Sequence, residues 1–110
     1  MRLEGKTAVV VGAGQSPGQG VGNGRATCLL FGREGARVMC VDRDLDSAEE
    51  TAQLVRDEGG EAEAIRADVT QETDLANVMA HTKSTWGQLD ILHNNVGISV
   101  AGGDAPVTEI

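Results

Sequence analysis

A glycine-dense segment, Gly12–Gly24, most constrains the fold of this chain, because it holds six of its 15 glycines between two regular elements. The apolar, β-branched residues before it predict a strand at 6–12 that is buried on both faces. The residues after it predict a helix at 22–34, followed by a second apolar strand at 36–42 that ends in Asp42. Strand, glycine turn, helix, strand and acid follow one another as in a βαβ unit that binds a dinucleotide.

Each part of this segment has a physical role in such a unit. Glycine adopts positive φ and lets backbone N–H groups approach a pyrophosphate without a Cβ in the way. The first turn of a helix offers unpaired N–H donors and the positive end of its dipole. Asp42 follows Gly24 at close to the expected spacing of about 20 residues, and its carboxylate can accept both ribose hydroxyls. A glycine loop that binds nothing would leave the flanking strand, helix and acid unexplained.

The loop is longer than the simplest fingerprint, G-x-G-x-x-G. Read from Gly12, that pattern places Pro17 at the third glycine, and proline neither donates an N–H nor packs as closely. We expect Gly12 and the pair Gly22 and Gly24 to be the anchors. The inserted segment 15–21 has a Pro-Gly turn signal and few apolar side chains, which favours a surface flap. Its contacts with a ligand stay open.

Charge and cysteine content narrow the class of protein. The net charge of −8 and the pI of about 4.5 argue against nucleic acid or an anionic membrane as partner. No apolar stretch reaches membrane-spanning length, and the N-terminus lacks a signal-peptide core. Cys28 and Cys40 have no Cys or His cluster around them and are expected to be reduced core thiols, with no metal site. A cytoplasmic location is the default expectation.

The rest of the chain alternates helices and strands. The further elements are expected at 45–58 (helix), 61–67 (strand), 71–86 (helix) and 89–95 (strand). The strand at 61–67 is partly polar and suits a sheet edge. The alternation predicts an α/β fold, a Rossmann-type doubly wound parallel sheet of strand order 3-2-1-4. Residues 1–110 would form the N-terminal part of a single dinucleotide-binding domain.

Capping and periodicity predict details of the two later helices. Asp44 or Asp46 is expected to cap the helix at 45–58 and Thr70 the helix at 71–86, with Gly59-Gly60 and Gly87 as stops. The inward-facing positions are expected to be Leu45, Ala48, Ala52 and Val55 in the first helix and Leu75, Val78, Met79 and Thr82 in the second.

Six short motifs resemble, in order, the N-terminal part of a short-chain dehydrogenase/reductase. They are Gly5-Lys6, Gly12…Gly22-x-Gly24-Arg-Ala, Asp42, Asp68-Val69, Leu89-Asp90 and Asn94-Asn95-Val96-Gly97, the last standing where the family has Asn-Asn-Ala-Gly. Each motif is weak alone, but together they cover nearly the whole chain in the family's order.

The resemblance implies where a dinucleotide would bind. It places Gly12, Asn23 and Gly24 at the pyrophosphate, Asp42 at the adenosine ribose, Asp68 and Val69 at the adenine, and Asn95, Val96 and Gly97 beneath the cofactor. Structural alternatives stay open, since Asp68 could only cap a helix and Asn94 could only close a turn. NAD is expected over NADP because Asp42 would repel a 2′-phosphate, although Arg43 could pair with one.

The resemblance also implies an activity, with departures. The family uses a Ser and a Tyr-x-x-x-Lys pair, whose tyrosine passes a proton as hydride moves. This sequence contains no tyrosine, Val11 replaces the usual threonine, and the glycine loop is six residues longer. We therefore expect the NAD(P)-binding half of an oxidoreductase whose full-length parent, a homo-oligomer, acts on an alcohol or carbonyl substrate. No catalytic residue is assigned, and the 110 residues alone are expected to be inactive.

Two other functions remain open. A non-catalytic dinucleotide sensor would keep the cofactor half and omit the chemistry. A methyltransferase that uses S-adenosylmethionine would also place a glycine loop and acids after its first strands. The motif at 94–97 and the helix start at 22–26 favour the oxidoreductase over the methyltransferase. The substrate is beyond the sequence.

Overall fold

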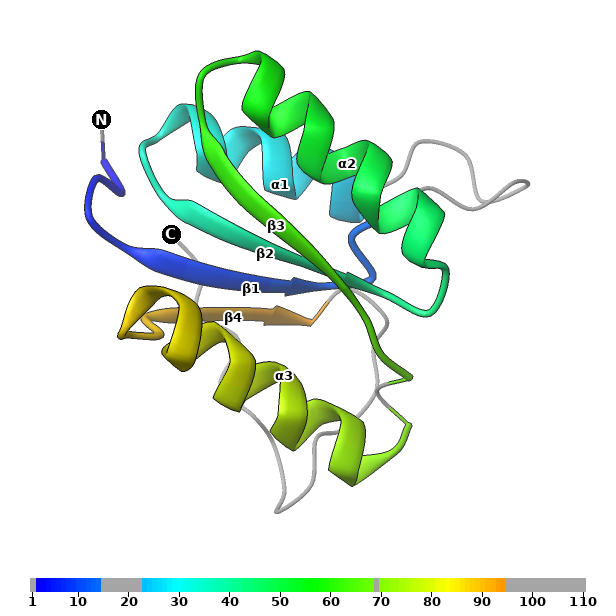
Figure 1. The fold of residues 1–110 in the computed structure, drawn as a ribbon. Coiled ribbons are helices and arrows are strands. Elements are labelled where there is room, and N and C mark those ends of the chain that lie inside the picture. Colours follow the sequence, from blue (N-terminus) through cyan, green and yellow to red (C-terminus); the bar gives the residue numbers. More distant parts are fainter. Residues whose placement is uncertain (1, 15–22, 69, 95–110) are drawn as a thin grey trace.

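Four parallel strands and three helices form the described part of the chain (Figure 1). The computed structural model describes residues 2–14, 23–68 and 70–94, and of Asn23 and Asn94 only the backbone. In chain order the elements are β1 (Thr7–Val11), α1 (Asn23–Arg33), β2 (Arg37–Asp42), α2 (Leu45–Asp57), β3 (Glu61–Arg66), α3 (Glu72–Trp86) and β4 (Ile91–Asn94). The strand order β3-β2-β1-β4 confirms the predicted Rossmann-type sheet. The segment 15–21 and residues beyond 94 lie outside the described residues.

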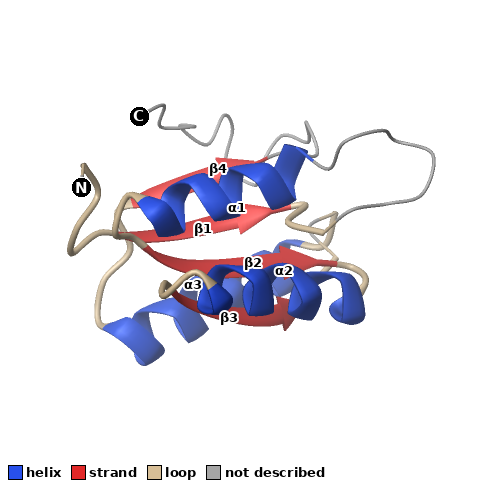
Figure 2. Ribbon diagram, turned by 90° about the horizontal axis from the view of Figure 1, so that it is seen from above, coloured by secondary structure: helices blue, strands red, loops and turns tan. Residues whose placement is uncertain are grey.

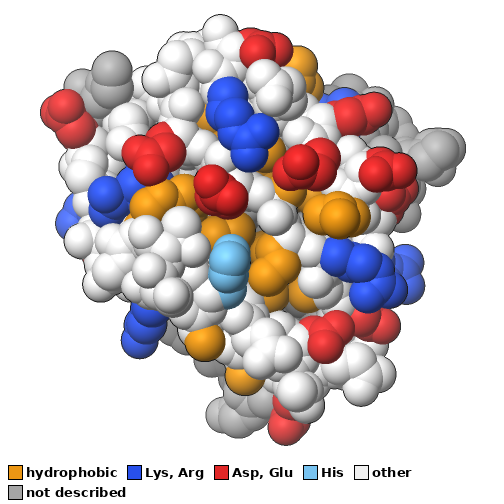
Figure 3. All heavy atoms as spheres, in the orientation of Figure 1, with side chains coloured by type: hydrophobic (Ala, Val, Ile, Leu, Met, Phe, Trp, Pro, Cys, Tyr) orange, Lys and Arg blue, Asp and Glu red, His pale blue; other side chains and the backbone are white. Residues whose placement is uncertain are grey.

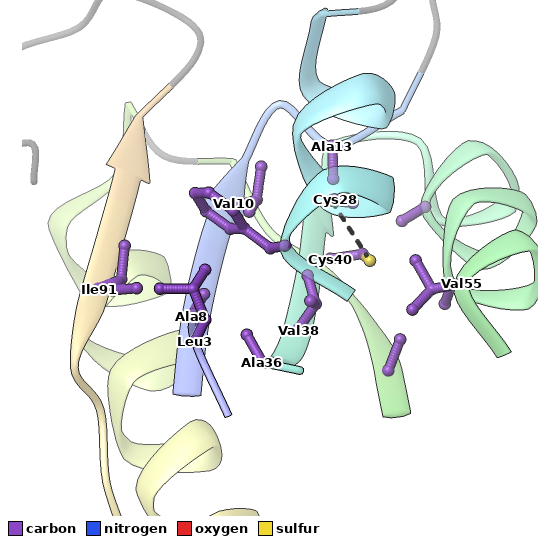
Figure 4. Packing of buried hydrophobic residues seen from close by; sticks show 14 residues of the cluster. Leu3, Ala8, Val10, Ala13, Cys28, Ala36, Val38, Cys40, Val55 and Ile91 are labelled. Carbon is purple, nitrogen blue, oxygen red and sulfur yellow. Dashed lines mark hydrogen bonds between the residues drawn. The ribbon is translucent and has the colours of Figure 1, made fainter. Parts of the chain in front are cut away.

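The sheet lies between two helical layers, with α1 and α2 on one face and α3 on the other (Figures 1 and 2). All five residues of β1 are buried, because successive side chains point to opposite faces and both faces are covered. Ala8 and Val10 pack in the cluster beneath α1 and α2 (Figure 4). Val9 and Val11 pack in the second cluster with Val78 of α3. Burying each valine stabilises the fold by roughly 1.5–3 kcal/mol.

The polar strand β3 forms the sheet edge, as its composition predicted. Glu61 and Glu63 are exposed there, and the Trp86 indole Nε1 donates to the Glu61 carboxylate at 2.9 Å, joining the end of α3 to the start of β3. Figure 3 shows this face of the molecule, where acidic and basic side chains surround scattered apolar ones. Among the described residues no helix is both long and apolar enough to cross a membrane.

The predicted ends of α2 and α3 are partly right. Asp44 caps α2, its carboxylate accepting from the Ser47 backbone N–H at 3.3 Å. Thr70 does not cap α3, which begins one residue later than predicted, with Gln71 at the capping position. The Thr70 hydroxyl donates instead to Asp68, which lies two residues earlier and within closer reach.

Two predicted inward-facing side chains are not buried. Leu45 is 43% exposed, because it is the first residue of α2 and lies beyond the end of β2, where the sheet no longer continues beneath the helix. Met79 is half-buried on α3. The other six predicted positions are buried: Ala48, Ala52, Val55, Leu75, Val78 and Thr82.

Candidate functional site

The turn after β1 leads directly to the end of β2. Gly12 has φ +78°, a conformation that glycine adopts without steric cost. The backbone N–H groups of Gly12 and Ala13 both donate to the Val41 carbonyl, at 2.8 and 2.9 Å. This pair of hydrogen bonds places the turn at the carboxyl edge of the sheet, beside the last residue of β2.

The start of α1 touches this turn. A Cβ added to Gly24 would overlap the Gly12 carbonyl oxygen and would lie 2.6 Å from the Gly12 carbonyl carbon. Any larger residue at Gly24 would therefore push α1 away from the turn. The close approach brings the N-terminal end of α1 to the carboxyl edge of the sheet, and the first N–H groups of a helix have no partner within the helix itself. Asn23 is the first residue of α1.

The Asp42 carboxylate is fixed at the end of β2 by two backbone donors. Its Oδ2 accepts from the Gly14 N–H at 2.9 Å, and its Oδ1 accepts from the Asp44 N–H at 3.0 Å. A Cβ on Gly14 would overlap the Ser47 hydroxyl and approach Asp42 Oδ2 to 3.0 Å. Glycine at position 14 therefore makes room for the carboxylate beside the turn.

Asp68 lies two residues beyond the end of β3 and is held by the next turn of chain. Its Oδ1 accepts from the Thr70 N–H at 3.0 Å and from the Thr70 hydroxyl at 2.6 Å. These two hydrogen bonds lower the pKa of Asp68, and the positive charges of Arg43 and Arg66 lower it further. Asp68 thus has a structural role at the entry to α3, and both of these bonds end on one of its two oxygens.

The two carboxylates lie at the ends of neighbouring strands. Asp42 pairs in register with Arg66, and the Ala67 N–H donates to the Asp42 carbonyl at 3.1 Å, so Asp68 follows immediately. In open parallel sheets, ligands bind outside the carboxyl ends of the strands. The structure brings Gly12, Gly24, Asp42 and Asp68 to this edge. Of the other expected site residues, Val69, Asn95, Val96 and Gly97 lie outside the described residues.

A polar cluster beneath the turn was not anticipated from the sequence. Thr51 of α2 is fully buried, and its hydroxyl donates to the Ala13 carbonyl at 3.0 Å. The Arg25 guanidinium, on the first turn of α1, donates from Nε to the Thr51 hydroxyl at 2.9 Å and to Glu50 at 2.9 Å. The available signal was a threonine between Ala48 and Ala52 on the buried face of α2, where apolar periodicity alone predicts an aliphatic residue.

The two thiols and His93 have packing roles in the described residues. Cys28 and Cys40 are free and fully buried, with their sulfur atoms 3.6 Å apart (Figure 4). The hydrogen bond with Cys40, together with burial, raises the pKa of the Cys28 thiol well above its ordinary value. His93 packs edge-on against Phe31, with ring centroids 6.1 Å apart, and His81 is exposed on α3. No group of three metal-ligating side chains gathers within the described ranges.

The structure therefore places the start of a helix and two carboxylates at one sheet edge. The N–H groups of Gly12, Ala13 and Gly14 already donate to Val41 and Asp42, so the start of α1 is the part of this edge that suits a phosphate. Carboxylates suit hydroxyl and amino donors. These are the complementary groups of an adenine nucleotide.

The sequence and the fold both match known proteins. Residues 6–110 match the family model described as short chain dehydrogenase. An uncharacterised oxidoreductase of Bacillus subtilis (strain 168) is 41% identical over 102 residues, which are 93% of this chain and 35% of the relative. Sorbitol dehydrogenase of Cereibacter sphaeroides is 38% identical over 110 residues, which are 100% of this chain and 38% of the relative.

A solved structure gives the same result. A 7α-hydroxysteroid dehydrogenase complexed with NADH and 7-oxo glycochenodeoxycholic acid matches with a TM-score of 0.76 at 34% identity. The match covers 84% of this chain and 34% of that one. The chain spans little more than a third of the length of the curated relatives it matches.

Proposed function

Because the chain belongs to the short-chain dehydrogenase family, we propose that its described edge is the adenosine and pyrophosphate half of an NAD site. In the full-length protein this half would serve hydride transfer between the nicotinamide and an alcohol or carbonyl substrate. Gly12, Asn23 and Gly24 would contact the pyrophosphate through backbone groups. The residues proposed for the adenine and for the underside of the cofactor are Asp68, Val69, Asn95, Val96 and Gly97.

The observation that carries this proposal is the carboxylate of Asp42. It lies at the end of β2 beside the glycine turn, and each of its oxygens accepts one backbone N–H. A carboxylate oxygen can accept more than one hydrogen bond, so both keep acceptor capacity for the ribose hydroxyls. The 7α-hydroxysteroid dehydrogenase of the comparison carries NADH, which supports the choice of cofactor class.

Asp42 also decides the preference for NAD over NADP in this proposal. A 2′-phosphate would face the Asp42 charge at the position of the ribose hydroxyls. Arg43 is the opposing group, because it follows Asp42 directly, is exposed, and could pair with such a phosphate. Its positive charge lies near Asp68, whose pKa it lowers. We propose that Arg43 interacts with the Asp68 carboxylate and that Asp42 determines which of the two cofactors binds.

Cofactor titration tests the proposal. The full-length protein is titrated with NAD, NADP and S-adenosylmethionine by calorimetry, before and after Asp42→Ala. We expect NAD to bind most tightly. Asp42→Ala should lower the affinity for NAD and reduce the difference between the affinities for NAD and NADP. Tighter binding of NADP would refute the NAD preference. Binding of S-adenosylmethionine alone would refute the oxidoreductase in favour of a methyltransferase.

An activity assay separates an enzyme from a dinucleotide sensor. The chain contains no tyrosine, so residues 1–110 alone should give no turnover with NAD and simple alcohols above a no-protein control. The full-length protein should give turnover with at least one alcohol. Binding without turnover across a broad alcohol and carbonyl panel would favour the sensor.

A further inference from the structure

We propose that Thr51 is a positioning residue for the cofactor site, because it orients Asp42 through the peptide bond between Ala13 and Gly14. This inference rests on the proposed role of Asp42 as the acceptor of the ribose hydroxyls. Thr51 lies on the buried face of α2 and does not itself reach the carboxylate in any hydrogen bond of the structure.

The peptide bond between Ala13 and Gly14 is held at both of its polar ends. Its carbonyl oxygen, on Ala13, accepts from the Thr51 hydroxyl at 3.0 Å. Its N–H, on Gly14, donates to Asp42 Oδ2 at 2.9 Å. In a planar trans peptide the carbonyl and the N–H point in opposite directions. Fixing the oxygen with Thr51 therefore fixes the direction in which the N–H presents itself to Asp42.

Arg25 constrains the hydroxyl that makes this contact. Its Nε donates to Thr51 Oγ1 at 2.9 Å, and a guanidinium cannot accept a hydrogen bond in return. The single hydroxyl hydrogen must then point elsewhere, and its two acceptors are the carbonyls of Ala13 at 3.0 Å and Ser47 at 3.2 Å. Arg25 also donates to the Ser47 carbonyl at 3.4 Å, so that acceptor already has a donor and Ala13 is the nearer one.

Loss of the hydroxyl would leave the Ala13 carbonyl without the donor that fixes it. Glycine at position 14 restricts the backbone little, so the peptide would be freer to rotate. A full flip is opposed, because it would turn the Ala13 carbonyl oxygen toward the Asp42 carboxylate and the two oxygens would repel each other. A partial rotation is enough to weaken the hydrogen bond from the Gly14 N–H, and Asp42 would then be held less firmly in the orientation that suits a ribose diol.

The test uses Thr51→Val, which keeps the shape of the side chain and removes the hydroxyl. Thr51→Ser restores the hydroxyl, and Thr82→Val is the matched control. Thr82 is equally buried, but its hydroxyl donates only within α3, to the Val78 carbonyl at 2.8 Å. The full-length variants are titrated with NAD and NADP, with Asp42→Ala alongside, and thermal melting is recorded for each.

We expect Thr51→Val to lower the affinity for NAD about tenfold, which is the size of one hydrogen bond to a charged group. The affinity for NADP should fall much less. The ratio of the two affinities should fall toward that of Asp42→Ala. Thr51→Ser should retain most of the wild-type ratio of NAD to NADP affinity. Thr82→Val should lower the melting temperature but leave that ratio unchanged. A purely structural role for Thr51 would change stability and leave the ratio unchanged.

The outcomes separate this inference from the function it rests on. If Asp42→Ala weakens NAD and Thr51→Val does not, the positioning role is wrong and the NAD site stands. If Asp42→Ala leaves NAD binding unchanged, the ribose contact is wrong and the positioning role falls with it. If Thr51→Val does not fold, Arg25→Lys carries the test. It keeps the charge but loses the guanidinium fork, and should narrow the ratio to a smaller extent; an unchanged ratio would overturn the inference.

Discussion

Replacing Gly24 with alanine tests how closely α1 must approach the glycine turn. Gly24 is the second residue of α1, and an added Cβ would overlap the Gly12 carbonyl oxygen. That oxygen belongs to the backbone, and Gly12 is anchored by its own N–H, which donates to Val41 at 2.8 Å. The turn therefore cannot move aside without losing hydrogen bonds at the end of β2.

Two effects of opposite sign decide the result. Alanine favours a helix over glycine by about 1 kcal/mol in a helix interior, and by less at its first turn. Forcing an extra carbon into a packed contact costs about 1–3 kcal/mol, and more when backbone must move. We expect the second effect to dominate, so that Gly24→Ala lowers the free energy of unfolding by about 2 kcal/mol. NAD affinity should also fall, because the helix start is displaced.

Gly32→Ala is the matched control on the same helix. Its Cβ would lie 2.7 Å from Cγ1 of Val55, the end of a side chain rather than backbone. Val55 is buried and its β-branched side chain is stiff, so some strain remains, but it is strain against a side chain and the helix-propensity gain offsets part of it. Gly32→Ala should therefore lower the free energy of unfolding by less than Gly24→Ala does. Urea unfolding followed by circular dichroism measures both variants. A Gly24→Ala protein as stable as the wild type, or more stable than Gly32→Ala, would refute the close-approach argument.

Three further predictions follow from burial and charge. The Thr7 backbone N–H, with Gln88, holds the pKa of Asp90 below its ordinary 3.8. The lowered pKa stabilises the folded protein above pH 3.8, and this stabilisation is lost as the pH falls through the pKa of Asp90 in the folded state. The free energy of unfolding of Asp90→Asn should therefore fall less steeply with decreasing pH in this acid range than that of the wild type. The Cys28 and Cys40 thiols are fully buried, so a thiol reagent should label them only on unfolding; rapid labelling of native protein would contradict this. Leu45→Ser should change the free energy of unfolding by at most about 0.5 kcal/mol in urea titrations, and a larger loss would mean that Leu45 is packed.

The sequence alone predicted the topology and the edge at which the site lies. The largely apolar, β-branched run of β1 requires a sheet covered on both faces, and helices alternating with strands require parallel crossovers. Both are short-range properties, set by side-chain alternation and by where glycine permits a turn. Asp42 could be placed because the last residue of a strand lies at the sheet edge in any such fold.

Only the tertiary structure could reveal what fixes that site in place. Thr51 is 38 residues from Ala13, and Asp42 is 28 residues from Gly14. In the folded protein, Thr51 and Asp42 bind the two polar ends of the single peptide bond between Ala13 and Gly14. Periodicity marks Thr51 as inward-facing but cannot say which carbonyl it meets. The exposure of Leu45 is also a tertiary property, because it depends on where β2 stops beneath α2. Such contacts depend on how elements distant in sequence pack together, and local sequence patterns carry no record of that packing.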